Sequence, residues 1–444
     1  MKTKVGMVSL GCPKNQVDAE LMLARFKNAG FEITADAGLA DVVVVNTCGF
    51  IEDAKRESIE NILEFCGLKQ EGRIKCVAVT GCLAERYRDE VAKEIPEADV
   101  ILGIGGNNDI VQAVLTALNG KKVESFPEKL ALPLSGERVL TTLPFFAYLK
   151  IAEGCDNRCS YCAIPAIRGA FRSRPIDEVV EEAQHLAKNG ITELTLVAQD
   201  TTRYGEDLYH KKALPELLAR LNGIEGLRWI RVLYCYPERI TDELITAIAE
   251  NDKVVKYLDI PIQHCDETVL KAMNRRGSRR ELTALIKKLR ERIPNVTLRT
   301  TLIAGFPGET KQQFAELCDF VKEMKFDHLG CFAYSQEEGT TAAGMPNQLD
   351  DKEKHRRADI IMTEQATVSE RLNQKCIGKT VEAVVEGFDR YAECFFGRTA
   401  KDAPEIDGKI FFTAPGKLPI GRYVKVKIDG VLDYDFTGTV VVEE

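Results

Sequence analysis

The stretch Glu153–Pro165, EGCDNRCSYCAIP, holds three cysteines, Cys155, Cys159 and Cys162, and no fourth ligand nearby. Structural zinc usually takes four Cys or His ligands from paired clusters, and no His lies between Phe146 and Gln184. A cubane iron–sulfur cluster held by only three thiolates keeps one iron open to an exogenous ligand. We therefore expect an iron–sulfur cluster here, with the open iron as the place of its chemistry.

The cysteine stretch lies at the start of an alternating strand and helix pattern. Six strand-like runs separated by amphipathic helical segments predict an incomplete parallel (β/α)6 barrel over residues 144–372, ending in a charged helix near 351–373. The runs are Tyr148–Ala152, Glu193–Ala198, Trp229–Leu233, Tyr257–Pro261, Leu298–Ala304 and His328–Tyr334. Chemistry in such barrels occurs at the carboxyl ends of the strands. The three cysteines follow the first of them.

Residues 1–120 predict a separate open parallel α/β domain. Cys12, Cys48 and Cys82 each come just after a strand-like run, KVGMVSLG, ADVVVVNT and KCVAVTG respectively. Ligand crevices in open α/β sheets lie at the carboxyl ends of the strands. The three distant thiols are therefore expected to converge there, although any one of them alone would read as a buried structural cysteine.

The end of the chain changes character. Residues 121–143 contain Pro and Gly without helical periodicity and predict a linker. Residues 373–444 hold five short β-runs broken by Gly and Pro, which predict a small closed antiparallel β-barrel of the oligonucleotide-binding kind. This module has 10 Lys and Arg against 12 Asp and Glu, a net charge of −2, unlike the basic surface of an RNA-binding module.

The composition of the whole chain supports a soluble multidomain protein. Its 444 residues exceed one domain, no run approaches the roughly 18 apolar residues of a membrane span, and the start lacks a signal-peptide pattern. Fourteen cysteines in such a chain are expected to stay reduced in the cytoplasm and to serve metal binding or chemistry. The formal charge of −8 favours a basic partner over a dedicated nucleic-acid role.

The spacing C-x3-C-x2-C, with Tyr161 before the last cysteine, resembles the signature of radical S-adenosylmethionine (SAM) enzymes. The segment RGAFRSRP at 168–175, the N-terminal cysteines and the C-terminal β module are similar to the methylthiotransferase family over nearly the whole chain. The resemblance implies two [4Fe-4S] clusters and a C-terminal TRAM domain. Cys155, Cys159 and Cys162 would hold the cluster that binds and reductively cleaves SAM. Cys12, Cys48 and Cys82 would hold the one that carries the donated sulfur.

Five further residues are expected to contact SAM. They are Tyr161, Gln199, Asp200, Gln263 and Gly305. Tyr161 would meet the adenine, Gln199 and Asp200 the ammonium, and Gln263 the ribose, while Gly305 would let backbone approach the cofactor. The alternatives are packing for Tyr161 and a turn or helix cap for Gln199 and Asp200. A second group, Arg168, Arg172 and Arg174, could contact a carboxylate of SAM or of the substrate, or form a solvated basic turn.

The remaining cysteines and one histidine are predicted to be structural. They are Cys66, Cys76, Cys235, Cys265, Cys318, Cys331, Cys376, Cys394 and His264.

Three stretches are similar to the class of the family that modifies ribosomal protein S12: SLGCPKNQVDAE (9–20), VAQDTTRYG (197–205) and LDIPIQHCDETVLKAMNR (258–275). The members that modify tRNA typically have Gly-Cys-Gln-Met-Asn at the first of these stretches. The resemblance implies methylthiolation of the β-carbon of an aspartate in S12. It also implies an electron donor such as flavodoxin or ferredoxin, a sulfur donor, contact with the ribosome and no membrane partner. The alternatives are methylthiolation of a tRNA adenosine and a non-catalytic iron–sulfur or zinc scaffold that binds ribosomes.

Overall fold

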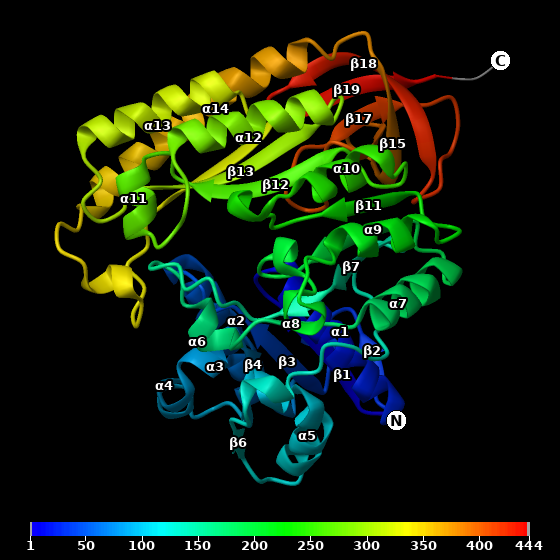
Figure 1. The fold of residues 1–444 in the computed structure, drawn as a ribbon. Coiled ribbons are helices and arrows are strands. Elements are labelled where there is room, and N and C mark those ends of the chain that lie inside the picture. The colour runs from blue at the N-terminus through cyan, green and yellow to red at the C-terminus, as the bar shows by residue number, and fades with distance from the viewer. Residues whose placement is uncertain (1, 442–444) are drawn as a thin grey trace.

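The computed structural model describes residues 2–441, and the chain forms three α/β or β units (Figure 1). The N-terminal unit is a six-stranded parallel sheet in the order β2-β1-β3-β4-β5-β6. Its strands are β1 (Lys4–Ser9), β2 (Glu32–Thr34), β3 (Val42–Thr47), β4 (Cys76–Gly81), β5 (Val100–Leu102) and β6 (Val123–Ser125). Its α-helices are α1 (Pro13–Asn28), α2 (Glu52–Gln70), α3 (Cys82–Arg86), α4 (Arg88–Glu94) and α5 (Ile110–Leu118). The open α/β prediction is confirmed.

The order in which the chain adds strands to this sheet changes direction at β1. The chain passes from β1 to β2 on one side and then crosses to β3 on the other side of β1. Connections that leave two neighbouring strands in opposite directions open a crevice at the carboxyl ends of those strands. The loops that carry Cys12 and Cys48 begin at this point. β3 is buried along its whole length, because the run Val42–Val45 packs on both faces of the sheet.

The segment 121–143, which we predicted to be a linker, contributes structure to the first unit. β6 pairs in parallel with β5, and a 3-10 turn at Lys129–Ala131 follows. Arg138 then ties this segment to both neighbours, since its guanidinium donates to Glu20 of α1 at 2.6 Å and to Glu182 of α7 (Ile176–Lys188) at 2.6 Å. The boundaries at 120, 143 and 372 stay predictions.

The middle unit is the incomplete parallel barrel. It consists of two three-stranded sheets, β7-β10-β11 and β12-β13-β14, and an isolated parallel bridge pairs Ile230 of β11 with Val254, which precedes β12. The strands are β7 (Phe146–Lys150), β10 (Glu193–Val197), β11 (Trp229–Val232), β12 (Tyr257–Gln263), β13 (Thr297–Ala304) and β14 (His328–Ala333). Among the described residues, β7 and β14 do not pair with each other, so the barrel stays open.

Short elements and outer helices complete the barrel unit. A two-stranded ribbon of β8 (Ala152–Glu153) and β9 (Arg172–Ser173) frames the cysteine stretch. The other helices are α6 (Ile164–Arg168), α8 (Glu206–Tyr209), α9 (Leu214–Asn222), α10 (Asp242–Glu250), α11 (Glu267–Ala272), α12 (Arg279–Arg292) and α13 (Lys311–Met324).

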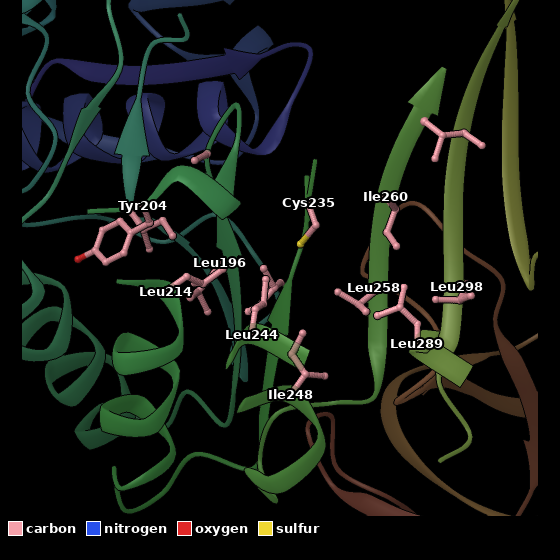
Figure 2. Close-up of a cluster of buried hydrophobic side chains, with 14 of the residues drawn as sticks. Leu196, Tyr204, Leu214, Cys235, Leu244, Ile248, Leu258, Ile260, Leu289 and Leu298 are labelled. Atoms are coloured by element: carbon pink, nitrogen blue, oxygen red, sulfur yellow. The ribbon is translucent and has the colours of Figure 1, made fainter. Parts of the chain in front are cut away.

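The main core lies between the barrel strands and these helices (Figure 2). Leu258 and Ile260 alternate with inward-facing residues along β12, so both face the helical layer together with Leu298 and Leu289. Tyr257, one position earlier, instead belongs to the core inside the barrel. This period of two gives the strand two buried faces, which explains its nearly continuous apolar sequence.

The C-terminal unit is the closed five-stranded barrel that the sequence predicted, reached through helix α14 (Asp351–Gln374). Its strands are β15 (Thr380–Asp389), β16 (Cys394–Thr399), β17 (Ile410–Thr413), β18 (Tyr423–Leu432) and β19 (Asp435–Val440). Four neighbouring pairs are antiparallel, but β17 and β19 run parallel. An odd number of strands cannot alternate in direction all the way around a closed barrel, so one parallel pair is required.

The C-terminal barrel packs against the amino ends of the middle strands. The first residue of each of three strands makes this contact. Glu193 of β10 binds Arg398 at 2.7 Å, and Trp229 of β11 meets the ring of Tyr423 edge-on. Tyr257 of β12 donates a hydrogen bond from its hydroxyl to Asp407. The core inside the barrel also takes residues from all three units, including Val17 and Leu21 of α1 and Val384 and Ala403 of the C-terminal barrel. The units therefore share one interior.

Replacing Glu193 tests this interface. The Glu193 carboxylate is fully buried between Arg398 and Arg231, so Glu193→Gln leaves the buried Arg231 without a counter-charge and Arg398 with Glu386 alone. We expect a loss of roughly 3–5 kcal/mol in the free energy of unfolding, measured by chemical denaturation. The matched control is Glu382→Gln, which breaks the exposed Arg228–Glu382 pair of the same interface and should cost less than about 1 kcal/mol.

The stabilising effect of Glu193 is expected to depend on pH. Burial raises the pKa of Glu193, but Arg398 and Arg231 outweigh burial and hold that pKa below its ordinary value. Its stabilising contribution is therefore complete above the unfolded pKa, about 4.3, and is lost as the pH falls toward the folded pKa. The stability gap between wild type and Glu193→Gln should shrink below about pH 4. A gap that widens in acid would contradict this assignment.

Candidate active site

The N-terminal cysteines meet at the crevice of the first sheet. Cys12 precedes α1 as its N-cap, Cys48 follows β3 directly, and Cys82 is the first residue of α3, after β4. A Cβ on Gly11, beside Cys12, would lie 2.9 Å from Cys48 Sγ, and a Cβ on Gly49, beside Cys48, would lie 2.9 Å from the backbone of Cys82. Burial, together with the neighbouring Cys82 and Cys12 thiols, raises the pKa of the Cys48 thiol to about 12. The predicted convergence of these residues is therefore observed.

Each of these cysteines is adjacent to a glycine that lets the loops approach. A Cβ atom on Gly11 would lie 2.8 Å from Cys48 Cβ, and one on Gly49 would lie 2.8 Å from the backbone N of Leu83. A Cβ on Gly81 would lie 2.5 Å from the backbone of Thr47, and Gly81 has a φ of +98°. Larger residues would separate the loops. The Gly-Cys and Cys-Gly pairs were a sequence signal that we did not use.

Hydrogen bonds fix the same loops. The Asn15 side-chain amide donates to the carbonyls of Leu10, at 2.7 Å, and Thr47, at 3.1 Å, which joins the ends of β1 and β3. The buried Ser58 hydroxyl of α2 accepts from the Cys48 backbone N–H and donates to its carbonyl, both at 3.0 Å. The thiol positions are therefore set by a rigid backbone.

The second set, Cys155, Cys159 and Cys162, lies on the loop between β8 and α6. Ser160 holds this loop against the end of α11, because its backbone N–H donates to Met273 at 3.0 Å and its hydroxyl to Ala272 at 2.8 Å. Burial raises the pKa of Cys155 to about 11, and the nearby Cys159 adds to this shift. Both sets thus present three close, free thiols from ordered loops.

The donor chemistry of both sets fits an iron–sulfur cubane. Thiolates are the ligands such clusters take, each on a different iron, and cationic iron would offset the cost of burying three thiolates together. Across residues 2–441, no three His, Cys, Asp or Glu side chains are grouped closely enough to hold a single metal ion.

A buried ionic cluster joins the two sets. Arg168, which ends α6, donates to Asp18 at 2.7 Å and to Glu153 at 2.9 Å through Nη1, and its Nη2 lies 3.4 Å from the Sγ of Cys82. Lys150 Nζ pairs with the same two carboxylates. All four charged side chains are buried, and their charges balance. Burial raises the pKa of Glu153, but Arg168 and Lys150 outweigh burial and lower it.

The two cysteine sets share a wall. Cys82 packs against Ala163 and Ile167, and Ala163 is the residue after Cys162. Figure 1 shows the corresponding helices, α3 of the first unit and α6 of the barrel unit, lying next to each other. The N-terminal thiols therefore face the mouth of the barrel.

Two of the residues predicted to contact SAM also bind groups of the protein. Asp200 is fully buried and caps the turn at Thr202, and its other oxygen accepts from Asn157 of the cysteine loop at 2.9 Å. Gln199 donates to Glu153 at 2.7 Å, and its side-chain oxygen is buried without a partner. The cap was the alternative function that the sequence allowed for Asp200. Gln199 keeps one free group for a ligand.

The other three residues lie around the barrel mouth. The Tyr161 hydroxyl accepts a 3.5 Å hydrogen bond from Arg275, whose guanidinium stacks 4.1 Å above the ring of Tyr236. Gln263 ends β12 with a φ of +69°, a strained backbone conformation for a residue with a Cβ. The Cβ space of Gly305 is filled by Lys354 of α14, so this glycine permits helix packing, which differs from the expected reason. Direct contact of these residues with SAM stays a prediction.

Arg172 and Arg174 bind groups of the protein, and their contact with a carboxylate of SAM or of the substrate stays a prediction. Arg172 donates to the carbonyls of Lys129, Leu130 and Leu132, while Arg174 pairs with Glu182 at 2.6 Å. Both guanidinium groups are used to fasten the 121–143 segment and α7 to the barrel.

Sequence reasoning also missed two contacts between the first unit and the barrel mouth. Glu337, after β14, accepts from Arg86 at 2.7 Å and pairs with Lys55 at 3.2 Å. Lys14 Nζ lies 3.5 Å from the ring centroid of Tyr234, which follows β11. Motif spacing could not reveal these pairs, because each joins segments that are more than two hundred residues apart.

The histidine prediction fits the geometry. His264 is fully buried, its Nδ1 accepts from the Asp266 backbone at 2.9 Å, and burial lowers its pKa to about 4. The neutral ring therefore serves the turn after β12.

Family models match each of the three units: "Uncharacterized protein family UPF0004" over 4–103, "Radical SAM superfamily" over 149–321 and "TRAM domain" over 377–441. A curated relative from Desulforamulus reducens, named ribosomal protein uS12 methylthiotransferase RimO, is 51% identical over 98% of both chains. The chain belongs to the RimO family of radical SAM methylthiotransferases. A family member of the same name from Acetivibrio thermocellus is 47% identical over 100% of this chain and 99% of its own.

Solved structures support the fold of this family member. The radical SAM methyltransferase TsrM from Kitasatospora setae aligns with a TM-score of 0.57 at 15% identity, over 76% of this chain and 77% of that one. The cobalamin-dependent radical SAM enzyme OxsB aligns with a TM-score of 0.52 at 10% identity, over 83% of this chain and 58% of that one. At these identities the likeness concerns the arrangement of the barrel and its neighbours alone.

A double-mutant cycle tests the buried ionic cluster. Because Arg168→Met leaves Asp18 and Glu153 short of a cation, we expect it to cost roughly 3–5 kcal/mol in the free energy of unfolding of the cluster-free protein. Asp18→Asn combined with Arg168→Met should cost roughly 1–3 kcal/mol less than the sum of the single changes. Chemical denaturation provides the values. Simple additivity would show that Arg168 and Asp18 act independently.

Proposed function

We propose that this protein adds a methylthio group to the β-carbon of an aspartate in ribosomal protein uS12. Two [4Fe-4S] clusters and SAM serve the reaction: the barrel cluster supplies one-electron cleavage of SAM to a radical able to remove hydrogen from carbon, and the N-terminal cluster supplies sulfur. The observation that carries the proposal is the packing of Cys82 on Ala163, next to Cys162, which brings the two sets of thiols close to each other.

In this proposal the six cysteines act as cluster ligands. Cys155, Cys159 and Cys162 form the first set, and Cys12, Cys48 and Cys82 form the second. Tyr161, Gln199 and Gln263 line the barrel mouth, where the unpartnered side-chain oxygen of Gln199 is available to a donor group of SAM. Asp200 acts indirectly, since it holds Asn157 of the cysteine loop in place.

Ion pairs and a hydrogen bond hold the first unit against the loop after β14. Glu337 anchors the loop after β14 to Arg86 and Lys55, and Arg86 also donates to the carbonyl of Gly49 at 2.9 Å. These bonds close the first unit over the barrel mouth. Excluding water there protects a reactive radical from side reactions.

Cysteine variants separate the two proposed cluster sites. Cys82→Ala should keep about half of the iron and still form deoxyadenosine from SAM under reductant, but it should not add the methylthio group. Cys162→Ala should lose the other half of the iron and deoxyadenosine formation. The control Cys66→Ala changes a buried cysteine outside both sets and should keep all iron. Iron and sulfide assays after anaerobic purification measure this; full iron in Cys82→Ala would refute the assignment.

The substrate is tested in cells. A strain that lacks the protein should lose the methylthio group from uS12, with unchanged modification of bulk tRNA, as measured by mass spectrometry of both. Loss from tRNA alone would instead support the tRNA adenosine alternative. The net charge of −2 in the C-terminal module favours uS12, because binding to RNA phosphates is driven by basic surfaces.

The remaining partners belong to the same proposal. We infer a one-electron donor such as flavodoxin or ferredoxin, a separate sulfur donor that renews the N-terminal site, and contact with the ribosome. A cytoplasmic location follows from the free thiols and the proposed substrate. None of the helices within residues 2–441 is long and apolar enough to cross a membrane.

A further inference from the structure

Lys14 is a buried cation without an acidic partner. Its side chain is 7% exposed, and no carboxylate of the described residues lies within ion-pair distance of it. The two other buried lysines, Lys150 and Lys354, each pair with at least one carboxylate. The nearby guanidinium of Arg168 increases the positive charge and is already matched by Asp18 and Glu153.

A buried ammonium without a counter-charge is costly, so such a group points to a function. The close neighbours that the described structure gives Lys14 are the face of Tyr234, 3.5 Å from Nζ to the ring centroid, and the Cys12 thiol. A cation–π contact with a neutral ring recovers only a part of the lost hydration and supplies no full negative charge. The site therefore has an unmet need for an anion.

Tyr234 is a rigid support for this cation. It has a φ of +61°, a conformation that bulky residues rarely adopt. Its backbone N–H donates to Asp259 at 2.9 Å, and its carbonyl accepts from the Thr201 backbone at 3.1 Å. The strained backbone turns the ring toward α1, where it meets the residue two positions after Cys12. Lys14 is thus held between the N-terminal thiols and the end of β11.

We propose that the Lys14 ammonium binds the carboxylate of the substrate aspartate. This inference rests on the proposed function and names the group that selects the substrate. A charge-assisted hydrogen bond from Nζ would meet the need for an anion. Since the β-carbon is bonded directly to the carboxyl carbon, holding the carboxylate also holds the reacting carbon between the two sets of thiols. Lys14 is then a residue that determines specificity.

Two other anions could bind Lys14, and for each of them the removal of Lys14 would have a different effect from the one expected for the substrate carboxylate. The carboxylate of SAM would make Lys14 necessary for SAM binding without uS12. An anionic cluster on Cys12, Cys48 and Cys82 would make it necessary for cluster retention. The substrate carboxylate makes Lys14 necessary only for the aspartate of uS12.

The test uses the cluster-loaded enzyme with SAM and purified uS12, in which the modified aspartate is either kept or replaced by asparagine. Wild type should bind the aspartate form about tenfold more tightly than the asparagine form. Lys14→Met should bind both forms equally weakly, while Lys14→Arg should keep most of the preference. Iron content and the Kd for SAM should match wild type in both variants.

Three results would overturn the inference: Lys14→Met that still prefers the aspartate form, Lys14→Met with weakened SAM binding in the absence of uS12, or Lys14→Met with reduced iron. Product analysis of wild type separates this from the proposed function. If wild type methylthiolates uS12 and Lys14→Met keeps the preference, only the role of Lys14 fails. If wild type leaves uS12 unmodified, both proposals fail.

Discussion

A buried ionic cluster centred on the guanidinium of Arg168 joins the first unit to the barrel. The guanidinium binds Asp18 of α1 and Glu153 of β8, and it reaches the sulfur of Cys82. Lys150 completes the balance of charge. A buried ion pair contributes little net stability compared with apolar packing, but removing one member is severe. Such a cluster therefore fixes how the two units sit together, and with that the distance between the two sets of thiols.

Local sequence patterns predicted the fold well. Runs such as Val42–Val45 are apolar throughout because both faces of a central parallel strand are buried, and this pattern is visible without a structure. The order of strand and helix then limited the middle unit to a parallel barrel. The parallel pair β17–β19 and strand β6 were not predicted, because three or four residues give too weak a pattern and strand order depends on distant contacts.

The site was predictable where its residues are close in sequence or follow equivalent strands. The spacing of Cys155, Cys159 and Cys162 identified one set, and the shared position after parallel strands identified the other. The partners of Arg172 and Asp200 were not predictable, since a side chain that could meet a ligand could equally meet a carbonyl or cap a turn. Lys14 and Tyr234 were missed for a related reason, since cation–π contacts across domains leave no periodic signal.

The position of the C-terminal barrel limits the size of any substrate that it helps to hold. This barrel covers the amino ends of β10, β11 and β12, whereas Cys155, Cys159 and Cys162 lie at the opposite end of the middle unit, where its strands end. A strand of seven residues, such as β12, is about 23 Å long. A single amino acid or nucleotide cannot bridge such a span, but a folded protein of the ribosome can touch one end while it extends a loop into the other.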